Sequence, residues 1–306
     1  MTKTYTVGIV GARGHTGSEL LRLLSSHPDV EVTYAGSREL DGEPVPSIEN
    51  LVFQSLDAEG VAALGLDAVF LALPNGVSGP FVEALSDDTT IVDISADHRF
   101  HDAWVYGLPE LNRDKIAGAK RIANPGCYAT VAQLTVAPYL ELIEGIPAVF
   151  GVSGYSGAGT TPSPKNDPAR LADSLMPYML TGHVHEREAS RNLGRPIRMM
   201  PHVHPAFRGL LVTSHIPTSA IGKDEAARLL IEAYQDEQLI TIQERAPELR
   251  EGAGQNGVII GGLDVSEDGR NTVLVAVEDN LLKGAAVQAI QNLNLGLGLP
   301  EFTSLA

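Results

Sequence analysis

The sequence predicts an α/β fold in which a parallel sheet is joined to a second domain of α+β composition. In the first third of the chain, short apolar runs alternate with helical patterns. One of these runs, 68–73, is apolar at every position, as expected for a parallel strand that is buried on both faces. After about residue 127 the strand candidates follow one another more closely, which indicates a mixed or antiparallel sheet.

The individual elements follow from apolar periodicity and turn residues. In the first part, strands are expected at 6–10, 30–34, 68–73, 90–94 and 121–123, with a helix at 17–24 that stops before Pro28. In the second part, strands are expected at 148–152, 211–216, 257–260 and 273–277, the last two joined by a hairpin turn at Asp268-Gly269. Helices are expected at 225–234, behind an N-cap at Asp224, and at 283–295.

Charge and cysteine content exclude several classes of protein. The chain has 306 residues and a net charge of −16, from 22 basic and 38 acidic side chains. This charge repels nucleic acid and anionic lipid, so neither is an expected partner. The single cysteine excludes an intramolecular disulfide. Because the sequence shows neither a membrane-spanning run nor a signal peptide, we expect a cytoplasmic protein of two domains.

Glycines mark the turn between the first strand and the first helix. Gly11, Gly14 and Gly17 are spaced by three, which differs from the usual G-x-G-x-x-G. Small residues still allow a sharp turn and let a pyrophosphate approach a helix N-terminus. The turn therefore predicts a Rossmann-type, dinucleotide-binding domain. The alternative is a turn that serves only helix–strand packing.

The end of the second strand predicts which dinucleotide is bound. Proteins that prefer NAD usually place a carboxylate there for the ribose 2′-hydroxyl. Here Ser37 and Arg38 come first, and the first carboxylate is Glu39. A hydroxyl and a guanidinium suit a 2′-phosphate, so NADP is favoured over NAD. Otherwise Arg38 is a solvated loop residue.

Cys127 follows Pro125-Gly126 and precedes a helical pattern. At a helix N-terminus the partial positive charge lowers the pKa of a thiol and makes thiolate available. A lone cysteine is more often a buried packing residue, but this position favours a nucleophile.

Histidines in two segments are candidates for the acid/base group. Two imidazoles and two carboxylates lie within 183–188, and His202 and His204 precede a turn that carries Arg208. Two histidines spaced in this way on a strand suit a metal site. Because a dinucleotide and a thiol already provide redox chemistry, we expect no metal and place His202 and His204 in a surface loop.

Nine motifs occur in order along essentially the whole chain. They are GARGHTGSEL at 11–20, LPNG at 73–76, DISADHR at 93–99, NPGCYAT at 124–130, SGYSGAG at 153–159, HVHERE at 183–188, PH at 201–202, RG at 208–209 and EDNLLKGAA at 278–286. With these motifs the chain resembles the N-acetyl-gamma-glutamyl-phosphate reductases of arginine biosynthesis, which are relatives of aspartate-semialdehyde dehydrogenase.

The resemblance implies that residues 1–126, rejoined by 283–306, bind NADPH, and that residues 127–282 form a catalytic and dimerisation domain of a homodimer or homotetramer. It implies Cys127 as the nucleophile and His183 as the acid/base, with His185 as the nearest competitor. Arg99 and Arg208 are expected to clamp phosphate and carboxylate, with His185 and the orienting carboxylate Glu188 also at the substrate. The expected cofactor-binding residues are Gly11, Arg13, Gly14, His15, Thr16, Gly17, Ser37, Arg38, Pro74, Asn75, Ser156, Gly157 and Asn280.

The expected reaction starts with attack of the Cys127 thiolate on an acyl phosphate, which leaves a thioester that NADPH reduces to an aldehyde. Two alternatives stay open: a relative that acts on an aspartyl or N-acyl-aminoadipyl phosphate, and a non-catalytic NADP sensor. In the family a basic residue often follows the Ser-Gly-Ala-Gly loop, whereas here Thr160 and Thr161 follow it. Whether Lys165 holds an anion there instead is left open.

Overall fold

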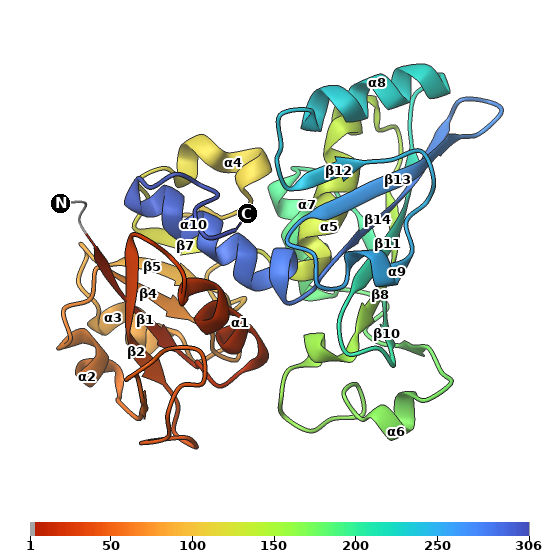
Figure 1. Ribbon diagram of the computed structural model, residues 1–306. Helices are drawn as coiled ribbons and strands as arrows, with labels where there is room; N and C mark the ends of the chain where they lie inside the picture. Colours follow the sequence, from red (N-terminus) through yellow and green to blue (C-terminus); the bar gives the residue numbers. More distant parts are fainter. Residues whose placement is uncertain (1–3, 306) are drawn as a thin grey trace. The chain divides into compact units, whose positions relative to one another are not determined.

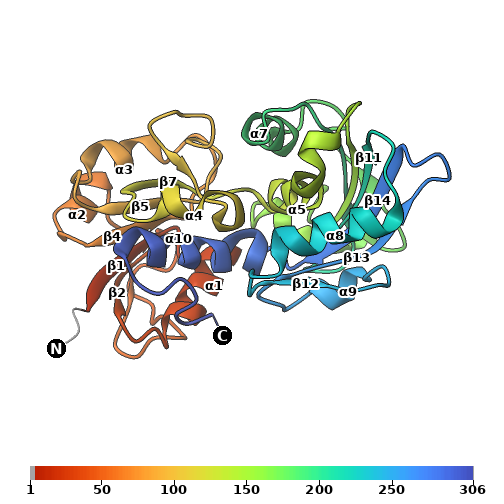
Figure 2. The same ribbon diagram turned by 90° about the horizontal axis from the view of Figure 1, so that it is seen from above.

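A computed structural model describes residues 4–305, and the chain divides into two compact units (Figure 1, Figure 2). Unit 1 comprises Met1–Gly126 and Ala285–Ala306, and unit 2 comprises Cys127–Gly284. No helix among the described residues is long and apolar enough to cross a membrane.

Unit 1 contains a seven-stranded sheet in which every neighbouring pair of strands is parallel. The strand order is β3-β2-β1-β4-β5-β7-β6. Strand β4 is buried at every position, as its unbroken apolar sequence predicts. The strands are β1 (Tyr5–Val10), β2 (Val30–Gly36), β3 (Phe53–Gln54), β4 (Ala68–Leu71), β5 (Thr90–Asp93), β6 (Val105–Tyr106) and β7 (Arg121–Ala123).

Helices connect and cover this sheet. Helix α1 buries the leucines of its apolar stripe. The C-terminal helix α10 returns to unit 1, where it packs against α1, α4 and β5 (Figure 2). The helices of unit 1 are α1 (His15–Leu24), α2 (Ala58–Ala62), α3 (Gly79–Ala84), α4 (Pro109–Ile116) and α10 (Val287–Leu297).

Unit 2 contains a mixed seven-stranded sheet with the order β12-β13-β14-β11-β8-β10-β9. The pairs β8–β10 and β12–β13 are parallel and the others are antiparallel. This composition confirms the α/β plus α+β class expected from the sequence. The strands are β8 (Ala148–Gly154), β9 (Met176–Pro177), β10 (Arg198–His204), β11 (Leu210–Pro217), β12 (Ile240–Ile242), β13 (Val258–Val265) and β14 (Asn271–Glu278).

Helices cover one face of the unit 2 sheet. Helix α5 packs on β11 and β14, α7 on β10, and α8 on β13. On the other face, alternate residues of the central strands stay partly exposed, and most are apolar. The helices of unit 2 are α5 (Cys127–Val136), α6 (Pro168–Leu171), α7 (Val184–Asn192), α8 (Lys223–Tyr234) and α9 (Leu249–Gly252), with 3-10 turns at Ala137–Leu142 and Tyr155–Ala158.

Three local expectations are wrong. Helix α8 begins two residues earlier than expected, and its N-cap is Gly222, so Asp224 lies in the first turn, where a carboxylate interacts favourably with the helix dipole. The helix expected from residue 283 starts as a π-helical turn, Leu282–Ala286, before α10 begins at Val287. His202 and His204 are half-buried residues of β10 and not loop residues.

Candidate active site

The order of strands in unit 1 reverses between β1 and β4, and ligands bind at the carboxyl ends of the strands at such a point. The predicted cofactor residues of unit 1 follow three of these ends. Gly11, Arg13, Gly14, His15, Thr16 and Gly17 follow β1, Ser37 and Arg38 follow β2, and Pro74 and Asn75 follow β4. Arg99 comes six residues after the end of β5. Parallel pairing therefore brings these residues to one edge of the sheet.

The glycine turn has the geometry that a dinucleotide needs. Gly11 has a φ of +85°, and a Cβ there would lie 2.3 Å from the carbonyl oxygen of Ala72. A Cβ on Gly17 would lie 2.5 Å from the Gly11 oxygen, so α1 packs directly on the turn. Gly14, the N-cap of α1, has no side chain with which to bond the first-turn N–H groups. These groups suit a pyrophosphate, so the residues fit the predicted cofactor.

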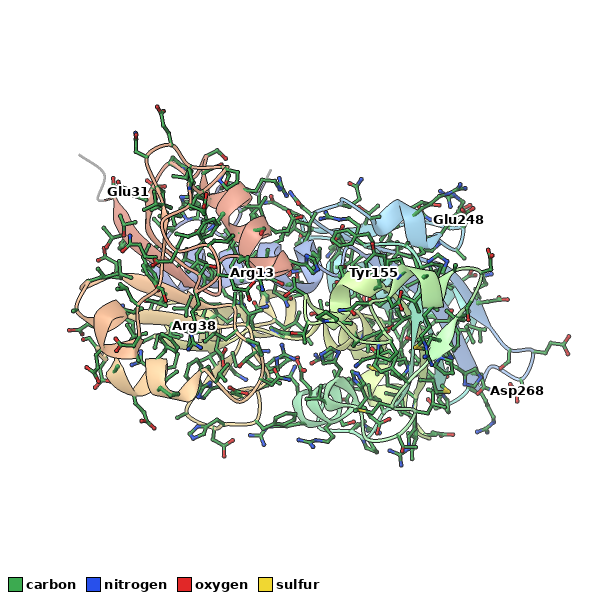
Figure 3. All side chains as sticks on the ribbon, turned by 90° about the horizontal axis from the view of Figure 1, so that it is seen from below. Arg13, Glu31, Arg38, Tyr155, Glu248 and Asp268 are labelled. Carbon is green, nitrogen blue, oxygen red and sulfur yellow. The ribbon has the colours of Figure 1, made fainter. Side chains whose placement is uncertain are left out.

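Arg13 spans the gap from the glycine turn to the segment after β2. Its guanidinium forms a two-bonded ion pair with Glu39, at 2.8 and 3.0 Å. The Ser37 hydroxyl accepts a hydrogen bond from the Leu40 N–H, and Arg38 is exposed (Figure 3). The Ser37 hydroxyl and the guanidinium groups of Arg13 and Arg38 therefore lie on two adjacent segments. Of these two arginines, Arg13 is the one that forms an ion pair with Glu39.

The loops after β4 and β5 hold each other in place. The Asn75 side-chain oxygen accepts a hydrogen bond from the Ala96 N–H at 2.9 Å. The Asp97 carboxylate accepts from the Gly76 N–H at 2.6 Å and from the Ser78 hydroxyl at 2.7 Å. Although burial opposes it, these bonds lower the pKa of Asp97. Pro74 and Asn75 are thus part of a fixed loop.

Arg99 lies against the backbone just before the predicted nucleophile. Its Nε donates to the Asn124 carbonyl and one terminal nitrogen donates to the Ile94 carbonyl, each at 2.8 Å. Nearby, the fully buried Asp93 carboxylate binds His98 Nδ1 at 2.6 Å. The two backbone carbonyls therefore hold the Arg99 guanidinium in a fixed position.

In unit 2, Cys127 is the first residue of α5 and is half-buried, as the Pro-Gly turn before it predicts. The backbone of Gly284 lies directly against it. A Cβ on Gly284 would be 2.6 Å from Cβ of Cys127 and 2.6 Å from Oε1 of the buried Glu278. The thiol is therefore packed between its own helix and the segment after β14.

Two tyrosines line the thiol. The Tyr128 hydroxyl donates to the His202 carbonyl at 2.7 Å and is also hydrogen-bonded to the Tyr178 hydroxyl. Burial and the nearby Cys127 raise the pKa of Tyr178 far above its usual value. Sequence reasoning missed Tyr178, which is 51 positions from Cys127 in an unremarkable loop.

His183 is the N-cap of α7, and its Nδ1 accepts a hydrogen bond from the His185 N–H at 3.2 Å. Its ring is 5.5 Å from that of Tyr178 and 6.2 Å from that of Tyr128. Burial, followed by the positive charge of Lys165, lowers the pKa of His183 to about 4, against the opposing effect of Glu186. His183 is therefore neutral at pH 7, with its proton on Nε2.

The other residues of the 183–188 segment differ in their surroundings. The ring of His185 is 4.8 Å from that of His183. The Glu186 carboxylate accepts from the backbone N–H groups of Gly182 and Met199, which ties α7 to β10. Glu188 is almost completely buried on α7. Both histidines thus lie near Cys127, Tyr128 and Tyr178, which we call the thiol cluster. The bonds of Glu186 hold the helix that carries these histidines.

Asn280 organises a second group of predicted residues. Its Nδ2 donates to the buried Ser156 hydroxyl at 2.9 Å, and its Oδ1 accepts from the Gly209 N–H at 2.9 Å. A Cβ on Gly157 would lie 3.7 Å from the same Nδ2. Asn280 therefore joins the 155–158 turn to the β10–β11 turn.

Arg208 lies in the β10–β11 turn and pairs with the buried Asp279 at 3.4 Å. Asp279 also accepts from the Gly254 N–H at 2.6 Å and the Leu281 N–H at 2.8 Å. The Asp279 carboxylate therefore fixes the start of the segment 279–284, which ends at Gly284. Within residues 4–305, no three His, Cys, Asp or Glu side chains are arranged to hold a metal ion.

The low pKa of His183 predicts an acid-dependent loss of stability. The unfolded chain takes up a proton as the pH falls through 6.5, whereas the folded chain does so only near 4. The contribution of His183 to the free energy of unfolding is thus fully present above pH 6.5 and falls by about 1.4 kcal/mol per pH unit as the pH drops from 6.5 to about 4. In His183→Asn, whose side-chain oxygen can replace Nδ1 as the N-cap acceptor, this component should vanish from urea unfolding curves recorded between pH 4 and 7. Equal pH slopes in both proteins would contradict the assignment.

Comparison with known proteins agrees with this arrangement. Residues 6–119 match the family described as "Semialdehyde dehydrogenase, NAD binding domain" and residues 127–280 match "Semialdehyde dehydrogenase, dimerisation domain". Among solved structures, aspartate semialdehyde dehydrogenase II of Vibrio cholerae, complexed with ASA, has a TM-score of 0.79 at 18% identity, over 97% of this chain and 99% of that one. The Candida albicans aspartate semialdehyde dehydrogenase with NADP has a TM-score of 0.75 at 18% identity, over 96% and 98%.

Closer relatives are found among curated proteins. The N-acetyl-gamma-glutamyl-phosphate reductase of Xanthomonas oryzae pv. oryzae is 52% identical over 312 residues, which cover 99% of each chain. That of Stenotrophomonas maltophilia is 51% identical over 311 residues, which cover 99% of this chain and 98% of the relative. At this identity over essentially the full length, the chain belongs to the N-acetyl-gamma-glutamyl-phosphate reductase family.

Proposed function

We propose that the protein catalyses the NADPH-dependent reduction of N-acetyl-gamma-glutamyl phosphate to N-acetyl-glutamate 5-semialdehyde and phosphate, a step of arginine biosynthesis. The observation that carries this proposal is a thiol at the first position of a helix, in a chain that matches its reductase relatives from end to end. The ring of Tyr128, the next residue, is 6.2 Å from that of the neutral His183. The loss of Cys127 by oxidation would remove the nucleophile, so we also propose the reducing cytoplasm as its compartment.

The first half of the reaction uses Cys127. At the N-terminus of α5 the helix dipole favours the thiolate, which attacks the carbonyl carbon of the acyl phosphate. The carbon–oxygen bond to phosphate breaks, and phosphate leaves with the bonding electrons. This expulsion needs cationic stabilisation, for which Arg99 and Arg208 are the proposed groups. The product of this half is a thioester on Cys127.

When bound, NADPH supplies the hydride that reduces the thioester. The glycine turn, Ser37 and Arg38 are proposed to hold it. The reduced carbon then carries a negatively charged oxygen, and His183 has its proton on Nε2, from which it can donate a hydrogen bond. His183 therefore acts as a donor to this oxygen. Cleavage of the carbon–sulfur bond releases the aldehyde and returns the thiolate.

The reverse reaction tests this function. With N-acetyl-glutamate semialdehyde, phosphate and NADP, the wild type should produce reduced nicotinamide, followed by its absorbance, and Cys127→Ser should lower the rate by a factor of at least about 10³. Aspartate semialdehyde serves as the control substrate for the open alternative. A signal without phosphate, or equal rates in the two proteins, would rule out the proposal, and a preference for aspartate semialdehyde would change the substrate.

The Arg13–Glu39 pair predicts an effect on cofactor affinity. A 2′-phosphate at the end of β2 would meet the Glu39 carboxylate, which also holds Arg13. Glu39→Gln removes the repulsion and releases Arg13, so the Kd for NADP should fall by about three- to ten-fold while that for NAD changes little. Calorimetric titration measures both. Glu31→Gln, at the exposed start of the same strand, is the matched control (Figure 3). Weaker NADP binding in Glu39→Gln would contradict this site.

We propose that the protein forms a homodimer through the open face of the unit 2 sheet. The strand pairing places Phe150, Thr213 and Val275 in one row across β8, β11 and β14, on the side away from α5. All three are partly exposed and none carries a charge, so two such faces can pack without bringing like charges together. A matching description, "dimerisation domain", applies to residues 127–280.

Thr213→Arg should convert the dimer to a monomer, because it buries an unpaired charge at the centre of that face. Light scattering after size-exclusion chromatography gives the mass directly. Ile231→Arg on the exposed side of α8, which covers the other face of the sheet, should leave the mass unchanged. A dimer that survives Thr213→Arg would place the interface elsewhere, and a mass of four chains in the wild type would indicate a tetramer.

A further inference from the structure

The long connection between β8 and β9 contains a turn, residues 159–166, that is held from within by one side chain. Asn166 Nδ2 donates to the carbonyl oxygens of Gly159 and Thr161, each at 2.8 Å. Its Oδ1 accepts from the Ser163 N–H at 2.7 Å. Gly159 takes a φ of +78° at the start of the turn. The segment runs beyond the edge of the sheet in Figure 1. The hydrogen bonds of Asn166 nevertheless fix the backbone of this turn, which includes Lys165.

Lys165 faces the thiol cluster. Its Nζ lies over the ring of Tyr178, 5.0 Å from the ring centroid. The Tyr178 hydroxyl is bonded to that of Tyr128, the residue next to Cys127, and the Tyr178 ring is 5.5 Å from that of His183. One tyrosine thus separates the ammonium group from both the nucleophile and the proton donor.

The charge of Lys165 is available to a ligand. No carboxylate within the described residues 4–305 forms an ion pair with it. Glu186, the acidic side chain that acts on His183, is bonded to two backbone N–H groups. By contrast, Arg208, the basic residue predicted for this unit from sequence, is paired with Asp279. Lys165 is half-buried, which strengthens its interaction with an anion relative to a fully solvated lysine.

We propose that Lys165 binds the phosphate group of the substrate beside Cys127. This inference rests on the proposed function, in which the phosphate is one bond from the carbon that the thiolate attacks. An ammonium group that only Tyr178 separates from His183 can attract that phosphate, whose negative charge increases as it leaves. The positive charge of Lys165 also lowers the pKa of His183 and so helps to keep it neutral. Lys165 would thus both bind the leaving phosphate and keep His183 in the form that donates from Nε2.

Alkylation of Cys127 tests the charge without any turnover, because the chain has a single cysteine. The ratio of the rates for anionic iodoacetate and neutral iodoacetamide reports the local potential. This ratio should fall on the order of five-fold in Lys165→Met and be retained in Lys165→Arg. Lys223→Met, at an exposed lysine of α8 in the same unit, is the matched control and should leave the ratio unchanged. Equal ratios in the wild type and Lys165→Met would overturn the proposal.

Protection experiments identify the anionic group. Inorganic phosphate should slow the alkylation of the wild type by iodoacetamide but not that of Lys165→Met. Protection by N-acetyl-glutamate alone, with none by phosphate, would overturn the assignment and identify Lys165 as a carboxylate site. In the reverse reaction, Lys165→Met should raise the KM for phosphate about ten-fold and leave that for the semialdehyde unchanged. If the reverse reaction fails while the alkylation ratio still depends on Lys165, the proposed function is wrong and the anion site stands.

Discussion

The contact between the Gly284 backbone and Cys127 is the constraint on which the site in unit 2 depends. Since a Cβ on Gly284 would be 2.6 Å from both the cysteine Cβ and a buried carboxylate oxygen, no side chain fits there. The chain passes this point in a π-helical turn, which places Lys283 in the interior. The same segment begins with Asp279 and Asn280, which hold Arg208 and Ser156. Residues 279–284 therefore both pack against the nucleophile Cys127 and anchor the loops that carry Arg208 and Ser156.

A chain with a net charge of −16 that binds anions needs basic side chains held in fixed positions at the binding site. Three of the arginines predicted for binding are restrained by the protein's own oxygens: Arg13 by Glu39, Arg208 by Asp279, and Arg99 by backbone carbonyls. Such restraint limits the entropy lost when an anion arrives, but a carboxylate partner also weakens the field that the anion meets. Lys165 has an aromatic ring in place of a carboxylate, so its full charge acts on the thiol cluster.

The features that local sequence fixes were predictable. The unbroken apolar run of β4, the glycine turn and the helix after Pro125-Gly126 each depend on residues within a few positions, and the structure has all three. The open face of the unit 2 sheet was not predictable. It becomes visible only when strand register aligns Phe150, Thr213 and Val275, which are far apart in sequence.

Residue types also do not give protonation states or long-range neighbours. The motif at 183–188 indicates an acid/base histidine, but only burial and the bond from the His185 N–H show that His183 is a neutral donor. Tyr178 and Lys165 carry no recognisable pattern, because their positions depend on a loop that is folded by Asn166 and returned to the sheet at β9. This loop places the charge of Lys165 over Tyr178, and that charge adds to the burial that keeps His183 neutral. A change in its length or in its internal hydrogen bonds would therefore alter leaving-group binding and proton donation together, even if Cys127 and His183 themselves were untouched.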